Sequence, residues 1–405
     1  MASKFEVYRA QILKELCFGK LLSASELSNR IQRSLPLTIR VLDELVKEGM
    51  IFEKGFAPST GGRRPQVYAL APERMYAIAI AMDQLTTKIA LVDLENFKKL
   101  NEKRISMPLK DNPDSLEELI GLIKNYLQEI SVPAHKILGV GIGMPGFIDL
   151  TTGVNYSFFE NNGKSIPDRM QKELGLPVYL DNDSSLIALA ELKLGGSKGK
   201  NNVMVINLSW GIGLGMIVNG SLFRGYNGFA GEFSHIPLFN NNKLCDCGKM
   251  GCLETEASMK VLVNRVKEGI ESGRVTSIKT LPEDMDSAFE LIIQAAIRGD
   301  QLAVELISEI ALIIGKGIAI LTHIMNPEEI VLSGRGAAAG KLLLPPIQQA
   351  LNRYCIPRLT AHTQLRISDL NKEAELYGAA ALVVEQFDKR FRNKRTNPEN
   401  YPFAA

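Results

Sequence analysis

One imidazole and three thiols lie close together in the polar stretch from Gly231 to Glu254. The four residues are His235, Cys245, Cys247 and Cys252. This soft donor set is the one that tetrahedral Zn²⁺ prefers, and Gly248 and Gly251 supply the tight turns that three thiolates around one ion need. Free thiols beside a histidine are the alternative, and a disulfide is disfavoured because nothing else indicates an oxidising compartment. The spacing therefore predicts a structural zinc site.

Two carboxylates flank these four residues. Glu232 precedes the histidine, and Glu254 follows the last cysteine. A bound zinc ion would fix the backbone between the two acids and hold both toward one pocket. Paired carboxylates in a fixed frame accept hydrogen bonds from neighbouring sugar hydroxyls, so we expect a sugar site beside the zinc site.

The composition is that of an ordinary globular protein. A chain of 405 residues is long enough for two or three compact units, and 45% hydrophobic and 23% charged residues are typical of soluble proteins. The first residues lack the apolar core of a signal peptide, and charged residues interrupt the apolar runs before they reach the length of a membrane span. We expect a cytoplasmic protein with no membrane partner.

Residues 1–71 have the pattern of a small DNA-binding domain. Apolar residues recur at helical spacing in three segments, and Ser23 and Glu26 form a capping box at the second. Ser34 can cap the third helix, and two short strands then flank a glycine-rich loop at 55–65. Three helices followed by a two-stranded hairpin predict a winged helix-turn-helix. A three-helix protein-interaction module would show the same spacing and is the alternative.

Charge favours DNA as the partner of this domain. Residues 1–70 carry eleven Lys and Arg and seven Asp and Glu, a net charge of +4 in a chain of net charge +2. In a winged helix the third helix enters the major groove by its N-terminal end, and the wing tip can enter an A·T-rich minor groove. The residues expected to face double-stranded DNA are Arg33, Ser34, Leu37, Thr38 and Arg40 on the third helix and Arg63 and Arg64 on the wing.

From residue 72 onward, strands and helices alternate in two halves. This repetition predicts an α/β body of two lobes, with a ligand cleft at the strand ends. We place the first lobe at 72–190, completed by a C-terminal helix at about 372–388. The second lobe is placed at 191–371, with the zinc loop and the dimerisation helices, and 389–405 is expected to be a flexible tail.

Five segments resemble the ROK family of repressors, open reading frames and sugar kinases. They are G-E-F-S-H at 231–235, C-D-C-G-K-M-G-C-L-E at 245–254, L-D-N-D at 180–183, G-M-P-G at 143–146 and S-T-G-G-R-R-P at 59–65. The zinc segment is the most specific, and the resemblance covers nearly the whole chain. It implies a winged helix joined to a two-lobed, actin-like body of the hexokinase type, usually as a homodimer or a dimer of dimers. The order of segments is most similar to the sugar-responsive repressor branch, including the N-acetylglucosamine type.

The resemblance also implies which residues contact the sugar. They are Gly146, Asn182, Asp183, Glu232, His235 and Glu254. In the family's kinases the aspartate that matches Asp183 is the general base, and here it would be vestigial. His235 would ligate zinc with one nitrogen and meet a hydroxyl with the other. The alternative role for Asp183 is the N-cap of a helix that begins at Ser184.

Both phosphate loops depart from the kinase pattern. Family kinases carry D-x-G-G-T-K at the first loop, whereas residues 83–88 of this chain place Leu85 and Thr86 at the two glycine positions. The second loop has Trp210, the single tryptophan of the chain, where kinases carry threonine. The sequence therefore predicts a transcriptional regulator, most simply a repressor, that senses a sugar or a sugar phosphate and catalyses no reaction. An active ATP-dependent sugar kinase with an appended DNA-binding domain is the alternative, and a zinc-stabilised scaffold for a partner protein is a third hypothesis.

Overall fold

The protein divides into two compact units. The computed structural model describes residues 4–56, 64–159 and 163–392. The first unit comprises Met1–Asp181 and Leu376–Ala405, and the second comprises Asn182–Glu375. The division falls before the helix that follows Asp181, and not after it at 190/191 as we expected, because that helix packs on the sheet of the second unit.

The first unit begins with three helices and a small antiparallel sheet, here called the N-terminal module. Its elements are α1 (Lys4–Gly19), β1 (Leu22–Ser23), α2 (Ala24–Ile31), α3 (Leu35–Lys47), β2 (Ile51–Phe56) and β3 (Gln66–Leu70), with strand order β1-β3-β2. The expected capping box is confirmed, since Ser23 Oγ accepts from the Glu26 backbone at 3.3 Å and Glu26 Oε2 accepts from the Ser23 backbone at 2.8 Å. Ser34 stands at the N-cap of α3, but its side chain makes no capping hydrogen bond.

Two five-stranded sheets, one in each unit, have the same strand order. In the first unit the order is β6-β5-β4-β7-β10, and in the second it is β13-β12-β11-β14-β15. In the first sheet β4 pairs antiparallel with β5 and parallel with β7, and in the second sheet β11 pairs antiparallel with β12 and parallel with β14. This repeated order confirms that the body is built from two α/β halves. The strands are β4 (Tyr76–Met82), β5 (Thr86–Asp93), β6 (Lys98–Ser106), β7 (Ile137–Met144), β10 (Val178–Asn182), β11 (Val203–Leu208), β12 (Ile212–Val218), β13 (Ser221–Phe223), β14 (Glu329–Ser333) and β15 (Gln364–Ile367), beside the separate pair β8 (Ile148–Asp149) and β9 (Val154–Asn155).

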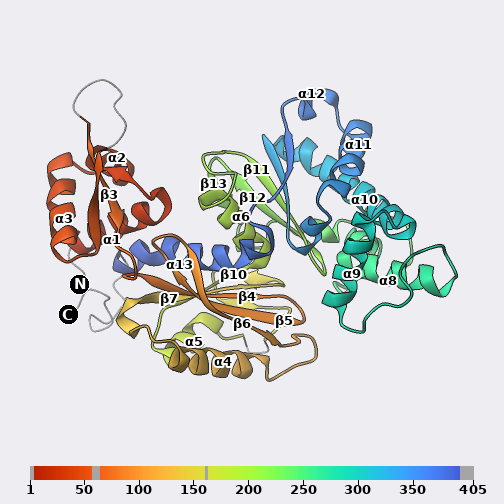
Figure 1. Ribbon diagram of the computed structural model, residues 1–405, viewed down its shortest axis with the longest axis horizontal. Helices are drawn as coiled ribbons and strands as arrows, with labels where there is room; N and C mark the ends of the chain where they lie inside the picture. Colours follow the sequence, from red (N-terminus) through yellow and green to blue (C-terminus); the bar gives the residue numbers. More distant parts are fainter. Residues whose placement is uncertain (1–3, 57–63, 160–162, 393–405) are drawn as a thin grey trace. The chain divides into compact units, whose positions relative to one another are not determined.

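Helices cover both faces of each sheet. In the first unit α4 (Ser115–Glu129) and α5 (Ile166–Leu174) lie on one face and α13 (Ala374–Arg392) on the other (Figure 1). Gly141 allows α13 its close approach, because a Cβ at this position would lie 2.0 Å from the carbonyl oxygen of Ala379. The helix continues to Arg392, so the start of the expected tail is helical, and 393–405 lie outside the described residues.

In the second unit, alternate residues of β11 face two different cores. Met204, Ile206 and Leu208 pack with the long helices, whereas Val203 and Val205 pack with α6. The helices of this unit are α6 (Asp183–Lys193), α7 (Glu254–Ala257), α8 (Met259–Glu271), α9 (Met285–Ile297), α10 (Gln301–Met325), α11 (Leu344–Tyr354) and α12 (Pro357–Thr360). Short 3₁₀ helices are η1 (Ala134–Lys136), η2 (Phe233–His235), η3 (Arg335–Leu342) and η4 (Asn371–Glu373). Within the described ranges, no helix has both the length and the apolar character needed to cross a bilayer.

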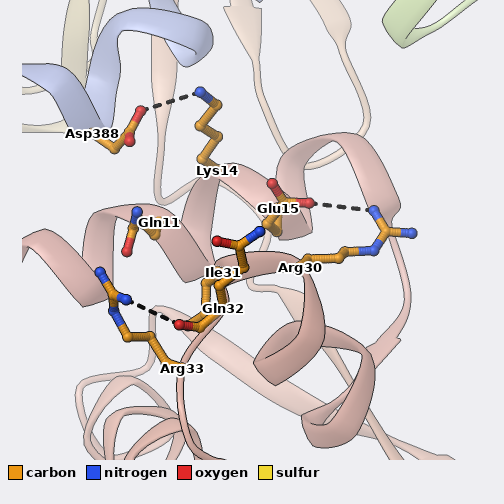
Figure 2. Close-up of a pocket in the computed structure, with 8 residues that line it drawn as sticks. All are labelled: Gln11, Lys14, Glu15, Arg30, Ile31, Gln32, Arg33 and Asp388. Carbon is orange, nitrogen blue, oxygen red and sulfur yellow. Dashed lines mark hydrogen bonds and ion pairs between the residues drawn. The ribbon is translucent and has the colours of Figure 1, made fainter. Parts of the chain in front are cut away.

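Helix α1 joins the N-terminal module to the rest of the first unit. Phe18 stacks on Phe97 of the loop after β5, with ring centroids 6.0 Å apart. Lys14 Nζ lies 3.1 Å from carboxylate oxygens of both Glu385 and Asp388 on α13. Figure 2 shows Lys14 reaching toward Asp388 at the edge of a pocket of about 320 Å³ between α1, the end of α2 and α13. An ion pair and an aromatic stack thus fix α1 to two separate elements of the first lobe.

Candidate functional site

The four predicted zinc ligands are brought together in the second unit. One donor atom each of His235, Cys245, Cys247 and Cys252 lies within 4.8 Å of the others. The Sγ atoms of Cys247 and Cys252 are 3.6 Å apart, and Cys245 Sγ is 3.5 Å from His235 Nδ1. Zinc bonds of about 2.0–2.3 Å in a tetrahedron place ligand atoms about 3.3–3.8 Å apart, whereas a disulfide would need about 2.05 Å. The group therefore fits a tetrahedral metal ion and excludes a disulfide between the two closest thiols.

Tight turns of the backbone hold the thiols in place. The Gly248 backbone donates to the Cys245 carbonyl at 2.8 Å, which closes the first turn. Gly248 and Gly251 have φ angles of +81° and +79°, a region that favours glycine. At Gly251 a Cβ would lie 2.0 Å from the Phe239 carbonyl oxygen, so a larger residue would displace the loop. Both glycines thus have the turn-forming role that the sequence predicts.

The histidine of this group also borders a set of acidic and amide side chains, which we call the carboxylate cluster. Its members are Asn182, Asp183, Glu232, His235 and Glu254. His235 Nε2 lies 3.8 Å from Glu232 Oε2, while Nδ1 of the same ring faces Cys245 Sγ. One imidazole therefore faces the thiols with one nitrogen and the cluster with the other.

The electrostatics of the cluster are visible in Glu232. Desolvation, followed by the negative charges of Asp183 and Glu254, raises the pKa of Glu232 to about 7. The side chain is nevertheless 38% exposed, so water screens part of this repulsion. A carboxyl group whose ionisation is disfavoured by burial and by neighbouring negative charges is a common feature of ligand sites.

The N-terminus of α6 orients two members of the cluster. Asn182 Oδ1 accepts from the backbone of Ser184 at 2.9 Å and of Ser185 at 3.3 Å, so Asn182 is the N-cap. The alternative that assigned the cap to Asp183 is wrong, because the helix begins one residue earlier than we expected. Asp183 is the first helical residue, and its Oδ2 accepts from Asn207 Nδ2 at 3.2 Å. The positive end of the helix dipole also favours a carboxylate there.

Glu254 connects the cluster to the second phosphate loop. Its Oε2 accepts from the Ile212 backbone at 3.2 Å. A Cβ at Gly211 would lie 2.6 Å from the same oxygen, so a larger residue there would displace the Glu254 carboxylate. A backbone N–H of the loop is thereby bonded to the protein's own carboxylate.

The other side of that loop forms a closed group, which we call the tryptophan corner. Its members are Ser209, Trp210, Asp286, Phe289 and Arg335. The Trp210 side chain is 5% exposed, with the guanidinium carbon of Arg335 4.0 Å from its ring centroid and the Phe289 ring edge-on at 6.2 Å. Arg335 also forms an ion pair with Asp286. Ring stacking and an ion pair thus hold these side chains together where the sequence comparison with kinases expects phosphate.

The first phosphate loop, in the first unit, is also bonded within itself. The Asp83 Oδ1 atom accepts from the backbones of Leu85 and Thr86, both at 2.8 Å. The Leu85 side chain is exposed. The backbone N–H groups of Leu85 and Thr86, where family kinases carry glycine, therefore already have a partner within the protein.

Gly146 lies in the first unit, after β7. Its φ is +100°, and a Cβ there would lie 2.7 Å from that of Ser157. Its place in the fold thus requires glycine whether or not a sugar approaches it.

The residues expected to face DNA are exposed with one clear exception. Arg33, Ser34, Arg40 and Arg64 are exposed, Leu37 is partly buried, and Arg63 lies outside the described residues. Thr38 is fully buried, and its hydroxyl donates to the Ser34 carbonyl at 3.1 Å. Its expected contact with DNA is wrong, because position 38 shares the inward face of α3 with Val41, Leu42 and Leu45.

Sequence reasoning missed two residues that shape the site. Asn207 is 4% exposed and donates to Asp183, and Asp286 anchors Arg335. An asparagine near the end of the apolar strand V-M-V-I-N-L is a signal that could have been read, since a buried amide needs partners. Nothing local to Asp286 distinguishes it from a residue of a solvated helix.

Comparison with known proteins assigns the family. The family model described as "ROK family" matches residues 77–386. A xylose repressor from Caldicellulosiruptor bescii is 30% identical over 388 residues, covering 94% of this chain and 96% of that protein. The crystal structure of a ROK family transcriptional regulator, a homologue of the E. coli MLC protein, has a TM-score of 0.77 at 25% identity, covering 96% of this chain and 98% of that one. A ROK family glucokinase from Streptomyces griseus, in complex with glucose and AMPPNP, has a TM-score of 0.65 at 27% identity, covering 76% of this chain and 98% of that one. The chain belongs to the ROK family, as the sequence motifs indicate.

Proposed function

We propose that this protein is a sugar-responsive transcriptional repressor that acts in the cytoplasm. The observation that carries the proposal is a difference in coverage. The transcriptional regulator matches 96% of this chain, whereas the glucokinase matches 76%. Because the family match begins at residue 77, the shorter coverage is what a kinase without the N-terminal module would give.

The N-terminal module would be a winged helix-turn-helix. Its order of helices and strands supports this assignment, with α3 as the recognition helix and the segment between β2 and β3 as the wing. The residues that would contact an operator are Arg33, Ser34, Leu37, Arg40, Arg63 and Arg64. A homodimer or a dimer of dimers would present two recognition helices to half-sites roughly 34–36 Å apart.

The carboxylate cluster would be the sugar site. Carboxylate and amide groups that a helix N-terminus and Asn207 hold in place offer fixed acceptors for vicinal hydroxyls. His235, Cys245, Cys247 and Cys252 would hold a structural zinc ion, whose four bonds supply rigidity to the segment between Glu232 and Glu254. Since the relative is named a xylose repressor, xylose is one effector to test beside glucose, N-acetylglucosamine and their phosphates.

Phosphoryl transfer would be lost in this protein. The reaction depends on positioned phosphates and Mg²⁺. Side chains at Leu85 and Thr86 replace the open glycine turn, and the tryptophan corner fills the second loop. The alternative is an active sugar kinase, which one observation favours: Asp183 retains a fixed carboxylate at the position of the general base. Formation of sugar phosphate from ATP by the purified protein would establish that alternative.

Coupling between sugar and DNA would pass through α13. The helix begins where the chain crosses between the units and, toward its other end, pairs with Lys14 of α1. Lys14 Nζ also donates to the Glu385 carbonyl at 3.1 Å, and its side chain is 16% exposed, so the contact is largely shielded from water. A change in lobe arrangement on sugar binding would move α13 and, through Lys14, the orientation of the module.

The test is operator affinity measured with and without saturating sugar at fixed salt. Allosteric coupling of about 1–3 kcal/mol corresponds to a change of roughly 5- to 150-fold. Lys14→Met keeps the aliphatic stem but removes the ion pair, and we expect it to reduce this change several-fold without altering sugar affinity. Lys99→Met, which breaks a pair with Glu102 on the same strand, is the matched control. If sugar binds but leaves the operator affinity of the wild type unchanged, the repressor proposal is wrong.

A further inference from the structure

Helix α3 presents two branched apolar side chains to solvent. Leu35 is 43% exposed and Ile39 is 41% exposed. Residues four apart in a helix lie one turn above each other on the same side, so the two form one continuous apolar strip. They occupy the first half of α3, at the border of the face that Val41, Leu42 and Leu45 bury. The fold of the module therefore leaves about two-fifths of each side chain uncovered.

Arginines border the strip. Arg33 and Arg40 are exposed, and each guanidinium lies over an aromatic ring of α1, Arg33 at 4.9 Å from the Tyr8 centroid and Arg40 at 5.6 Å from that of Phe5. These stacked positions hold two cations beside the apolar strip. A partner for this surface must combine negative charge with an apolar feature of small size.

The major groove of DNA has this combination. Its phosphates are anionic, and the C5-methyl group of thymine is the apolar group that a base pair presents there. A second copy of this chain fits less well, because a two-fold contact on this strip would bring the arginines of both copies together. The pattern thus favours DNA over self-association.

We propose that Leu35 and Ile39 read thymine methyl groups in the operator and thereby set sequence preference, while Arg33 and Arg40 bind phosphates. The proposal rests on the DNA-binding function proposed above. Phosphate contacts fix position without reading sequence, whereas an apolar contact to a methyl group distinguishes T·A from the other pairs. Burial of one methyl group corresponds to about a four-fold change in affinity.

The experiment uses the full-length protein and selection from a random DNA duplex library. The selected duplex is then remade with deoxyuridine in place of thymidine at one position at a time, which removes only the methyl group. We expect at least one position per half-site where wild-type affinity falls about four-fold. At that position Leu35→Ala or Ile39→Ala should bind the two duplexes equally, and Leu35→Met or Ile39→Val should keep the preference.

Leu21→Ala is the matched control, because Leu21 is 45% exposed but lies outside α3. It should keep the wild-type response to deoxyuridine. If the duplex binds in a salt-dependent way and Arg33→Ala weakens it, yet no deoxyuridine position lowers affinity, the methyl reading is overturned and DNA binding stands. The methyl reading is also overturned if the alanine variants lose as much affinity as the wild type when deoxyuridine replaces thymidine. If no duplex is selected, both this inference and the proposed function fail.

Discussion

The carboxylate cluster and the tryptophan corner share one loop but have opposite characters. In the cluster, desolvation and then the like charges of Asp183 and Glu254 raise the pKa of Glu232 to about 7. In the corner, the Arg335 guanidinium has a carboxylate partner and an aromatic ring to stack on, and the tryptophan is 5% exposed. Repulsive groups held in place are typical of a site kept for a ligand, whereas closely packed rings and a paired guanidinium are typical of structure. This contrast is what we expect if the sugar half of a kinase-like site is kept while its phosphate half is closed, as proposed above.

The largest effect is expected from a substitution in the proposed zinc group. The carboxylate cluster should depend on the metal, whereas the tryptophan corner should not. Cys252→Ser removes a fully buried thiol of the proposed zinc group, and we expect the protein to lose its zinc and its sugar affinity to fall by about 100-fold or more. Metal content per chain and calorimetry measure the two effects. Cys355→Ser, at a buried cysteine of the same unit outside the metal group, should change neither. Fluorescence of the single tryptophan should stay the same, and a large change would show that the corner depends on the metal too.

Truncation of the corner should cost stability and spare sugar binding. Trp210→Ala removes a nearly buried indole, so the free energy of unfolding should fall by about 3–5 kcal/mol. Urea denaturation followed by circular dichroism measures this, and Trp210→Phe, which keeps an aromatic ring, should lose clearly less. A variant as stable as the wild type would mean that the corner is not a packed structure.

Removal of one charge from the carboxylate cluster should weaken sugar binding and leave stability nearly unchanged. Asp183→Asn keeps the size of the side chain, and the loss of charge-assisted hydrogen bonds worth about 1.5–3 kcal/mol should weaken sugar binding roughly 10- to 150-fold. Glu256→Gln is the control, since that carboxylate accepts instead from Asn241 and Lys243. Unchanged calorimetric affinity for Asp183→Asn would remove Asp183 from the sugar site.

The smallest effect is expected at the residue that connects the two regions. Glu254→Gln can still accept from the Ile212 backbone, so sugar affinity should fall less than about ten-fold. Because the negative charge of Glu254 helps to raise the pKa of Glu232, the substitution should lower that pKa toward its ordinary value. A carboxyl titration followed by NMR tests the direction, and a pKa that rises or stays would contradict the arrangement of the cluster.

The sequence predicted best the features that depend on local spacing. The zinc group, the Ser23 capping box and most buried strands of both sheets carry their signal within a few residues. The edge strand β6 (Lys98–Ser106) was not predicted, because its residues are mainly polar or charged and show no hydrophobic alternation. The two-residue β1 is too short to show any period.

Long-range partners were the part that spacing could not predict. Asp286 meets Arg335 and Lys14 meets Asp388 only after the chain folds. Thr38 is a different case, since its spacing from Val41, Leu42 and Leu45 already places it on the buried side of α3, and only its polar side chain favoured an exposed position. A polar residue on an amphipathic helix is therefore weak grounds for a contact with DNA.

The central claim is that sugar binding is kept and linked to DNA, while phosphoryl transfer is lost. It is tested most directly by titration of a selected operator duplex, followed by fluorescence anisotropy, with saturating sugar in the presence and absence of ATP and Mg²⁺. The claim predicts that sugar alone changes operator affinity at least five-fold and that no ADP forms. Formation of stoichiometric ADP and sugar phosphate, together with an operator affinity that is the same with and without sugar, would contradict it.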